Sequence, residues 1–236
     1  MRKDKDSFYV KYIKCILDFF IALFALIVLS PLLLILTIIG AIVMKGNPFF
    51  VQKRPGMIDK KTGRERIIPY IKFRSMSNAK DSQGNLLPDE QRLGRYGKAL
   101  RASSVDELPS LVNVLLLQCA LIGPRPFLVR DLIFMTDEQR RRHSVRPGLT
   151  GLAQINGRNN ITWEQKFEYD LQYIDSGITF IGDAKIIMQT VGKVLKRSDT
   201  VREGTVSDMD FGDWLIWEGK VTQGEYEQKQ AEAKEL

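Results

Sequence analysis

The stretch that decides the fold is FFIALFALIVLSPLLLILTIIGAIVM, Phe19 to Met44, which contains no charged side chain. About 20 apolar residues in a helix span the hydrocarbon core of a bilayer, so this stretch is long enough to cross a membrane. A cleaved secretory signal is not indicated, because the apolar stretch is too long and no A-x-A-like site follows it. One plain transmembrane helix is therefore the simplest interpretation.

Two features of this stretch favour a different arrangement. Ser30 and Pro31 lie in its middle, and proline removes a backbone donor and clashes with the carbonyl four residues earlier, which kinks a helix. Both flanks are basic, which favours the cytoplasmic side for each of them. The basic residues are Arg2, Lys3, Lys5, Lys11 and Lys14 before the stretch, and Lys45, Lys53 and Arg54 after it. A re-entrant helix that breaks at Ser30-Pro31 and returns satisfies both features, and it would leave Asp18 solvated near the headgroups.

The composition indicates a packed domain joined to this segment. The chain has 236 residues, 44% of them hydrophobic, and a formal net charge of +7. A positive surface field suits nucleic acid, anionic lipid or phosphorylated small molecules. Cys15 and Cys119 form neither a disulfide framework nor a metal motif, which fits a reducing, cytoplasmic-facing compartment. His143 is the only histidine, so Ser-His-Asp chemistry and histidine-rich metal sites are not supported.

The pattern beyond the apolar stretch predicts an α/β fold that is mostly helical with few short strands. Short strands are expected within 46–76 around a turn at Asp59–Gly63. Helices are expected at 92–102, 107–121, 136–143, 163–175 and 183–196, and loops at 78–89 and 145–160. The helix at 183–196 is amphipathic, so it either faces a core or lies on the membrane surface. We expect a membrane region at 1–45, a catalytic domain at 46–200 and a C-terminal extension at 201–236, whose last part is expected to be mobile.

Three arginines occur beside proline or glycine. Arg125 lies between two prolines, Arg146 precedes Pro147-Gly148, and Arg158 follows Gly157. A guanidinium matches phosphate oxygens with a planar fork of donors. Lys72 and Arg74 add positive charge, and no Walker-type motif is present. A single such arginine is usually a solvated surface charge, but the repeated pattern favours anion binding.

Asp106 and Glu107 are adjacent carboxylates within SSVDELPSL, at the start of a predicted helix. An acidic residue there often caps the helix and complements its dipole. That explanation accounts for one carboxylate better than for two. Neighbours on a helix point in different directions, so one carboxylate can attack phosphorus while the other binds magnesium. The basic surroundings are expected to keep both ionised.

Taken together, the motifs resemble those of the bacterial sugar transferase family, the monotopic polyprenyl-phosphate phosphoglycosyl transferases. The similar segments span roughly residues 8–197, and they resemble the small, catalytic-domain-only branch. These segments are GNPFFVQKRPG, IKFRSM, RASSVDELPSLVNVL, LIGPRP, RHSVRPGLTGLAQINGRN and YDLQYID.

The resemblance implies transfer of a sugar-1-phosphate from a nucleotide diphosphate sugar, usually a UDP-sugar, to undecaprenyl phosphate, with release of UMP. This would be the first membrane step in assembling a capsule, O-antigen, exopolysaccharide or glycoprotein glycan. It also implies a monotopic protein on the cytoplasmic face of the bacterial plasma membrane, with a re-entrant helix broken at Ser30-Pro31 and further amphipathic helices lying on the surface.

The resemblance also assigns roles to residues. Asp106 is the expected nucleophile, which would form a phosphosugar-aspartate intermediate, and Glu107 the expected Mg²⁺ ligand. Lys72 and Arg74 are expected near the lipid phosphate, and Gln154 is an expected substrate contact. The expected phosphate-binding residues are Arg101, Arg125, Arg146 and Arg158.

One segment departs from the family pattern. Leu116–Ala120 reads LLQCA where Lys-Gly-Asp/Glu-Met-Ser is common, and Leu152 stands where Trp is frequent. A catalytically inactive membrane scaffold therefore stays open as an alternative, as does a membrane-tethered nucleic-acid-binding protein. No aromatic stacking platform supports the latter, so we expect no nucleic-acid partner. A homodimer is compatible with the sequence, and the sequence does not identify the sugar.

Overall fold

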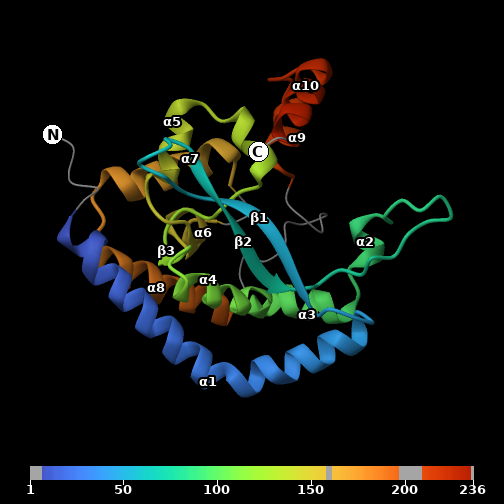
Figure 1. Ribbon diagram of the computed structural model, residues 1–236, viewed down its shortest axis with the longest axis horizontal. Coiled ribbons are helices and arrows are strands. Elements are labelled where there is room, and N and C mark those ends of the chain that lie inside the picture. The colour runs from blue at the N-terminus through green and yellow to red at the C-terminus, as the bar shows by residue number, and fades with distance from the viewer. Residues whose placement is uncertain (1–6, 158–160, 197–208, 235–236) are drawn as a thin grey trace.

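The computed structural model describes residues 7–157, 161–196 and 209–234 (Figure 1). It is mostly helical with a few short strands, as predicted. The elements are η1 Tyr9–Ile13, α1 Lys14–Val43, β1 Phe49–Ile58, β2 Glu65–Phe73, α2 Asp89–Arg92, α3 Arg95–Ser103, η2 Val105–Ser110, α4 Leu111–Leu115, β3 Ala120–Ile122, η3 Val129–Phe134, α5 Asp137–Arg140, η4 Arg141–Ser144, β4 Gly148–Thr150, α6 Leu152–Ile155, α7 Trp163–Asp175, α8 Phe180–Lys196, α9 Phe211–Trp217 and α10 Gln223–Ala233.

The apolar stretch forms the long helix α1, which bends near its middle into two arms (Figure 1). Pro31 lies inside the helix, and the Ser30 hydroxyl donates a hydrogen bond of 2.8 Å to the carbonyl of Ile27. The missing proline N–H and the clash of its ring with the preceding turn account for the bend. The helix continues through Pro31, so the predicted break at Ser30-Pro31 is a bend and not an interruption.

Both arms of α1 contact the rest of the protein. In the first arm, the Lys14 ammonium lies 2.8 Å from the Asp183 carboxylate, and the Asp18 carboxylate lies 3.3 Å from the Arg146 guanidinium. In the second arm, the Tyr96 hydroxyl donates to the carbonyl of Leu36 over 3.1 Å. Asp18 is only 2% exposed, so the expectation that it is solvated near the headgroups is wrong. Its buried carboxylate is compensated by Arg146 and holds α1 against the domain.

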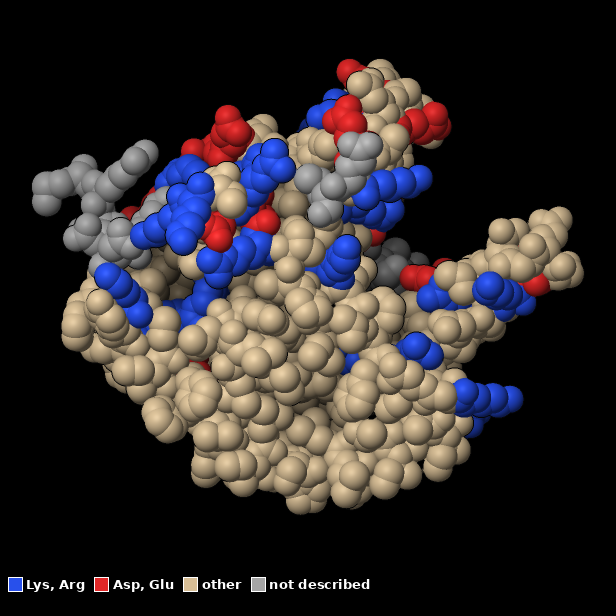
Figure 2. All heavy atoms as spheres, viewed as in Figure 1, with Lys and Arg blue, Asp and Glu red and all other residues tan. Residues whose placement is uncertain are grey.

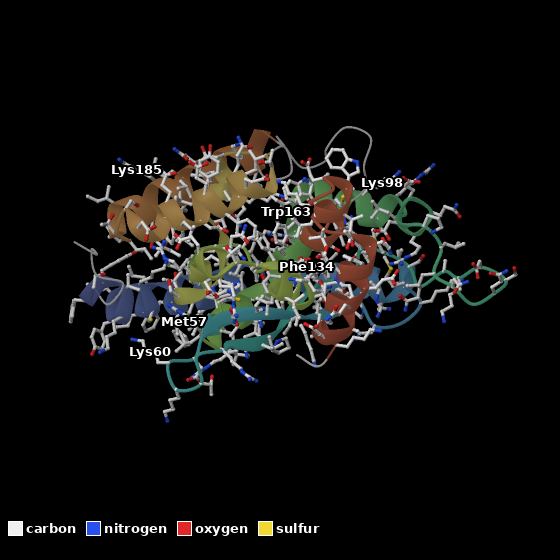
Figure 3. The ribbon with its side chains drawn as sticks, turned by 90° about the horizontal axis from the view of Figure 1, so that it is seen from above. Met57, Lys60, Lys98, Phe134, Trp163 and Lys185 are labelled. Atoms are coloured by element: carbon white, nitrogen blue, oxygen red, sulfur yellow. The ribbon has the colours of Figure 1, made fainter. Side chains whose placement is uncertain are left out.

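The β1–β2 hairpin confirms the predicted strands and turn. Pairing runs from Phe49 opposite Phe73 to Ile58 opposite Glu65, with an irregularity between Pro55 and Ile58. The hairpin runs diagonally across the body, with its turn at the end of the molecule where α5 lies (Figure 1), and Figure 3 shows Lys60 at this turn.

The predicted helix at 107–121 and the predicted loop at 145–160 are both wrong in part. The first becomes a 3₁₀ turn, the short helix α4 and strand β3, while the second contains β4 and α6. β3 and β4 pair in parallel, Ala120 with Gly148 and Ile122 with Thr150. A Cβ on Gly148 would lie 2.1 Å from the Gly123 nitrogen, so this crossing requires glycine.

The described part of the C-terminal extension forms the helices α9 and α10, and the expectation that its last part is mobile stays a prediction. Phe211 and Leu215 of α9 are buried in an aromatic core with Phe127, Phe134 and Trp163. Figure 3 labels Phe134 and Trp163 of this core. The Gly212 N–H donates to the Asp131 carboxylate over 3.1 Å, which fixes the start of α9 to η3. Because Phe127 directly follows the Pro124–Pro126 loop, this core supports that loop from behind.

Charge and apolar surface are separated across the molecule. On the face seen in Figure 2, charged side chains gather in the upper half and the lower half is almost free of them. The lower half contains α1, whose Phe24, Leu34 and Ile42 side chains are 68%, 62% and 71% exposed. In the described part of the chain, Tyr9–Val43 is the helix long and apolar enough to cross a membrane. A contiguous apolar surface of this kind marks a membrane or protein contact.

Candidate active site

The two adjacent carboxylates lie where the chain turns from α3 into η2. Ser104 takes a left-handed conformation with φ of 56°, which ends α3 and starts the 3₁₀ turn Val105–Ser110. Asp106 and Glu107 are in the first turn of η2, and Pro109 fits inside it. The turn packs against β2, and Lys72 of β2 is one of the cations that act on Asp106.

Glu107 is held by an arginine of the Pro-Arg-Pro loop. The Arg125 guanidinium donates to both carboxylate oxygens, from Nη1 to Oε2 over 2.9 Å and from Nη2 to Oε1. This ion pair raises the pKa of Arg125 above its usual range. The pairing of a planar fork with a carboxylate fixes the orientation of both groups.

Asp106 is largely enclosed and makes no side-chain hydrogen bond to the part of the chain that the structure describes. Burial, followed by the charge of Glu107, raises the pKa of Asp106 to about 6, against the opposing effect of Lys72, Arg125 and Arg101. Asp106 is thus mostly ionised at neutral pH, although its basic neighbours do not outweigh desolvation. An ionised carboxylate oxygen that makes no side-chain hydrogen bond to the described residues is a suitable nucleophile.

Lys72 of β2 and Arg101 of α3 both act on the Asp106 carboxylate. Burial, followed by Arg54, lowers the pKa of Lys72 to about 8. Arg101 donates from Nε to the Ser75 hydroxyl over 3.1 Å. A Cβ on Gly97 would lie 1.9 Å from the Ser75 carbonyl oxygen, so the close contact of α3 with this segment requires glycine.

Arg54 belongs to this cluster and was not predicted. Its guanidinium donates to the Pro126 carbonyl over 3.1 Å and to the Gln52 side chain over 2.6 Å. Burial, followed by the charge of Arg125, lowers the pKa of Arg54 to about 10. Arg54 lies in the segment GNPFFVQKRPG. Side chains alternate between the two faces of a strand, and this alternation could have indicated that Arg54 faces inward.

Arg142 was also missed, because the run RRRH reads as a solvated basic face. It is 1% exposed and pairs with the buried Asp170 carboxylate over 2.6 Å. Its guanidinium lies 3.6 Å from the centre of the Phe127 ring and donates to the Arg125 carbonyl over 2.5 Å. Arg54 and Arg142 therefore hold consecutive carbonyls of the Pro-Arg-Pro loop, and this positions the Arg125 side chain on Glu107.

The structure brings together five of the predicted site residues, which are Lys72, Arg101, Asp106, Glu107 and Arg125.

Three others are placed elsewhere or make different contacts. Arg146 binds Asp18 and the Cys119 carbonyl. Gln154 is buried in α6, and its amide has no hydrogen-bond partner within the described residues. The Arg74 N–H donates to the Pro48 carbonyl over 2.7 Å. Arg158 lies outside the described residues. The roles of these four remain predictions.

No group of three or more His, Cys, Asp and Glu side chains suited to a metal ion occurs in residues 7–157, 161–196 and 209–234. Mg²⁺ does not require such a group, because it is often bound by one or two carboxylates together with substrate phosphates and water. Asp106 and Glu107 fit that pattern. Arg125 donates to both Glu107 oxygens, and a carboxylate oxygen can accept or coordinate at more than one position.

Comparison with known proteins agrees with this geometry. The model of the family described as "Bacterial sugar transferase" matches residues 9–197. The chain is 45% identical over 183 residues to the uncharacterized sugar transferase EpsL of Bacillus subtilis, covering 78% of this chain and 87% of EpsL. It is 34% identical to the exopolysaccharide production protein PSS of Rhizobium leguminosarum, covering 76% of this chain and 94% of PSS.

A longer relative is the UDP-glucose:undecaprenyl-phosphate glucose-1-phosphate transferase of Klebsiella pneumoniae. It is 38% identical over 191 residues, which are 75% of this chain and 38% of the Klebsiella protein. The family match covers the bent helix, the hairpin, the carboxylate pair and the Pro-Arg-Pro loop. The chain therefore belongs to the bacterial sugar transferase family.

Proposed function

We propose that the protein transfers a sugar-1-phosphate from a UDP-sugar to undecaprenyl phosphate, through a covalent intermediate on Asp106. The names of the relatives from Klebsiella pneumoniae, Xanthomonas campestris and Escherichia coli support this donor and acceptor class. The product would be a membrane-bound sugar diphospholipid, and UMP would leave. Such a product starts the assembly of a bacterial polysaccharide.

The observation that carries the proposal is the Asp106 carboxylate, which makes no side-chain hydrogen bond to the described residues and lies within a cluster of cations. Lys72, Arg101 and Arg125 all favour the charged form of Asp106. Burial lowers the pKa of Lys72, followed by the charge of Arg54, while Glu107 and Asp106 act in the opposite direction. A diphosphate entering this cluster would bring negative charge to Lys72, Arg101 and Arg125. Adventitious surface charges do not produce such an enclosed arrangement around one free oxygen.

The reaction proceeds in two displacements at one phosphorus atom. An Asp106 oxygen attacks the phosphorus that carries the sugar, the bond to the bridging diphosphate oxygen breaks, and UMP leaves with that oxygen. An oxygen of the lipid phosphate then attacks the same phosphorus, and the bond to Asp106 breaks. The carboxylate is restored, and no proton is consumed overall. Arg125, Lys72 and Arg101 are placed to offset the charge of the phosphoryl oxygens.

Magnesium would be held by Glu107, with Asp106 close by and with the substrate phosphates. The ion would neutralise phosphate charge as it develops. Glu107→Gln is expected to raise the Mg²⁺ concentration needed for half-maximal rate by at least about tenfold. A magnesium titration of initial rates measures this, with the exposed Glu90→Gln as a control. An unchanged titration in Glu107→Gln contradicts the metal role.

Membrane insertion of α1 would bring the site to the level of the acceptor phosphate. The bend in α1, the attachment of both arms to one body and the apolar lower face support a re-entrant helix. The basic flanks of α1 favour the cytoplasmic side of the plasma membrane. A straight helix that crosses the membrane would separate one arm of α1 from its contacts with the domain. The charged groups of Lys14 and Asp18 would then lose the partners that compensate them.

The re-entrant topology predicts that both flanks of α1 lie on one side. Single cysteines at Ser7 and Lys61, in a background without Cys15 and Cys119, are expected to react equally with a membrane-impermeant maleimide in inside-out vesicles. Neither is expected to react in right-side-out vesicles. Opposite accessibility of the two sites would show a straight crossing. Mass spectrometry of the labelled chain measures the extent of reaction.

The pH dependence follows from two groups. The pKa of Asp106 is about 6, and its charged form rises with pH, so kcat/KM is expected to fall about tenfold per unit below pH 6. The pKa of Lys72 is about 8, and its charged form is lost as pH rises, so the rate declines above pH 8. Lys72→Arg is expected to remove the alkaline decline, since arginine stays protonated. A pH profile that Lys72→Arg leaves unchanged contradicts the role of Lys72.

The decisive experiment is incubation of the purified protein with a panel of UDP-sugars, Mg²⁺ and no acceptor. The expected result is UMP release in an amount equal to enzyme and one added sugar phosphate by mass spectrometry. Addition of undecaprenyl phosphate then gives turnover. A chain that forms product without the adduct refutes the covalent step, and absence of both favours an inactive scaffold.

A further inference from the structure

The turn after α4 presents two neighbouring leucines to the outside. Leu116 is 60% exposed and Leu117 is 51% exposed. Leu117 has a φ of 56°, a left-handed conformation that glycine adopts without cost and that a leucine side chain disfavours. Local backbone preference and burial within the domain both fail to explain a leucine at this position.

The turn is firmly built. The N–H groups of Gln118 and Cys119 both donate to the Asn113 carbonyl, over 2.9 and 3.1 Å. The buried Asn113 side chain accepts from the Ile71 N–H over 3.1 Å and donates to the Pro69 carbonyl over 2.8 Å, which ties the turn to β2. The leucines are therefore displayed in a fixed position, and they do not belong to a loosely attached loop.

The position of the turn matches the apolar side of the molecule. Figure 1 shows α4 and α8 at one level, directly above α1. α8 exposes Phe180, Ile181 and Met188 at 58%, 67% and 74%. In the view from above, the first arm of α1 lies between α8, marked by Lys185, and the hairpin, marked by Met57 (Figure 3). Since Leu116 and Leu117 lie beside Met57, the turn flanks α1 on the side opposite α8.

A hollow of about 190 Å³ lies beside the leucines, with Met57 and Ile68 in its wall and Arg66 and Arg146 in its lining. The Arg66 side chain is 68% exposed and pairs with the Asp59 carboxylate over 2.8 Å. Apolar side chains next to guanidinium groups suit the boundary between acyl chains and anionic headgroups. Arg146 also contacts Cys15 and Asp18, so one lining residue of the hollow touches the first arm of α1.

We propose that the Leu116–Leu117 turn inserts into the lipid of the same leaflet as α1. The turn and α8 then contact the membrane on opposite sides of α1. This rests on the membrane topology given under Proposed function. Two flanks on either side of a bent helix fix the tilt of the domain about the helix axis. The turn thereby sets the direction in which the cation cluster faces the bilayer.

Spin-label accessibility tests the proposal on the full chain in phosphatidylethanolamine–phosphatidylglycerol vesicles. In a background with Cys15 and Cys119 replaced by alanine, labels are placed one at a time by Leu116→Cys, Ile35→Cys and Lys61→Cys. Ile35 reports on α1, and Lys61 lies at the exposed hairpin turn. Collision with oxygen dominates in lipid, and collision with a soluble nickel chelate dominates in water.

The expected result is an oxygen-to-nickel collision ratio at 116 that is close to the ratio at 35 and several-fold above the ratio at 61. A ratio at 116 equal to that at 61, with oxygen preferred at 35, overturns the proposal and leaves the topology of α1 standing. Nickel preference at 35 refutes that topology and the proposal with it. Spin–spin broadening at 116 that disappears on dilution with unlabelled protein assigns the turn to a contact between two copies and overturns the lipid assignment.

Discussion

Asp106→Asn is expected to lower the rate of sugar-phosphate transfer on the order of 10⁴-fold or more, because it would remove the proposed nucleophile. Asparagine has nearly the same shape, and Asp106 makes no side-chain hydrogen bond to the described residues, so the fold is expected to persist. The substitution also removes the carboxyl whose pKa burial and Glu107 raise to about 6. Initial rates of UMP release measure the effect.

The loss of transfer rate in Asp106→Asn is expected to arise at the covalent step and not at substrate binding. The variant is expected to bind the UDP-sugar, measured by equilibrium binding, and to show no added sugar phosphate by mass spectrometry. Glu90→Gln, at an exposed acidic position, is expected to keep full activity. Residual transfer near the wild-type rate in Asp106→Asn would show that the lipid phosphate attacks the donor directly.

Arg142→Met is expected to lower the free energy of unfolding by about 3–5 kcal/mol, because it leaves the Asp170 carboxylate buried without its partner. Arg142 and Asp170 are 1% and 2% exposed, so water cannot compensate the charge. The same substitution removes the donor to the Arg125 carbonyl and the contact with the Phe127 ring. Denaturant titration of the detergent-solubilised protein measures the change.

Two matched variants separate the charge from the packing. Arg141→Met alters the neighbouring arginine, which lies at the surface and pairs with Glu138 and Asp175, and is expected to cost about 1 kcal/mol or less. The double variant Arg142→Met/Asp170→Leu removes both charges and is expected to recover most of the stability. If it recovers stability without activity, Arg142 positions the Pro-Arg-Pro loop. A cost for Arg142→Met as small as that of Arg141→Met would contradict the buried pair.

The sequence was informative wherever local chemistry decides the outcome. Pro31 in an apolar stretch predicts a bend, and Asp59–Gly63 between two short apolar runs predicts the hairpin turn. The adjacent carboxylates and the Pro-flanked Arg125 predicted an anion-binding centre, and the structure brings Asp106, Glu107 and Arg125 together.

Long-range contacts were not readable in the same way. The parallel pairing of β3 with β4 joins segments with little strand signal, and only the close approach of Gly123 and Gly148 makes it possible. Arg142 appeared in a basic run, and its burial depends on Asp170 and two aromatic rings that come from other elements. Helix α9 is stabilised by burial against Phe127 and Phe134, which its own composition does not reveal.

The attachment of both arms of α1 to one body has a consequence for the lipid environment. A helix that reaches across a bilayer must adapt to its full thickness by tilting or by deforming the lipid. A helix that turns back inside the membrane meets only the half of the bilayer that it enters. Acyl-chain length in the opposite monolayer would then have little effect on activity. Headgroup spacing in the near monolayer would decide how easily the lipid acceptor reaches the candidate active site.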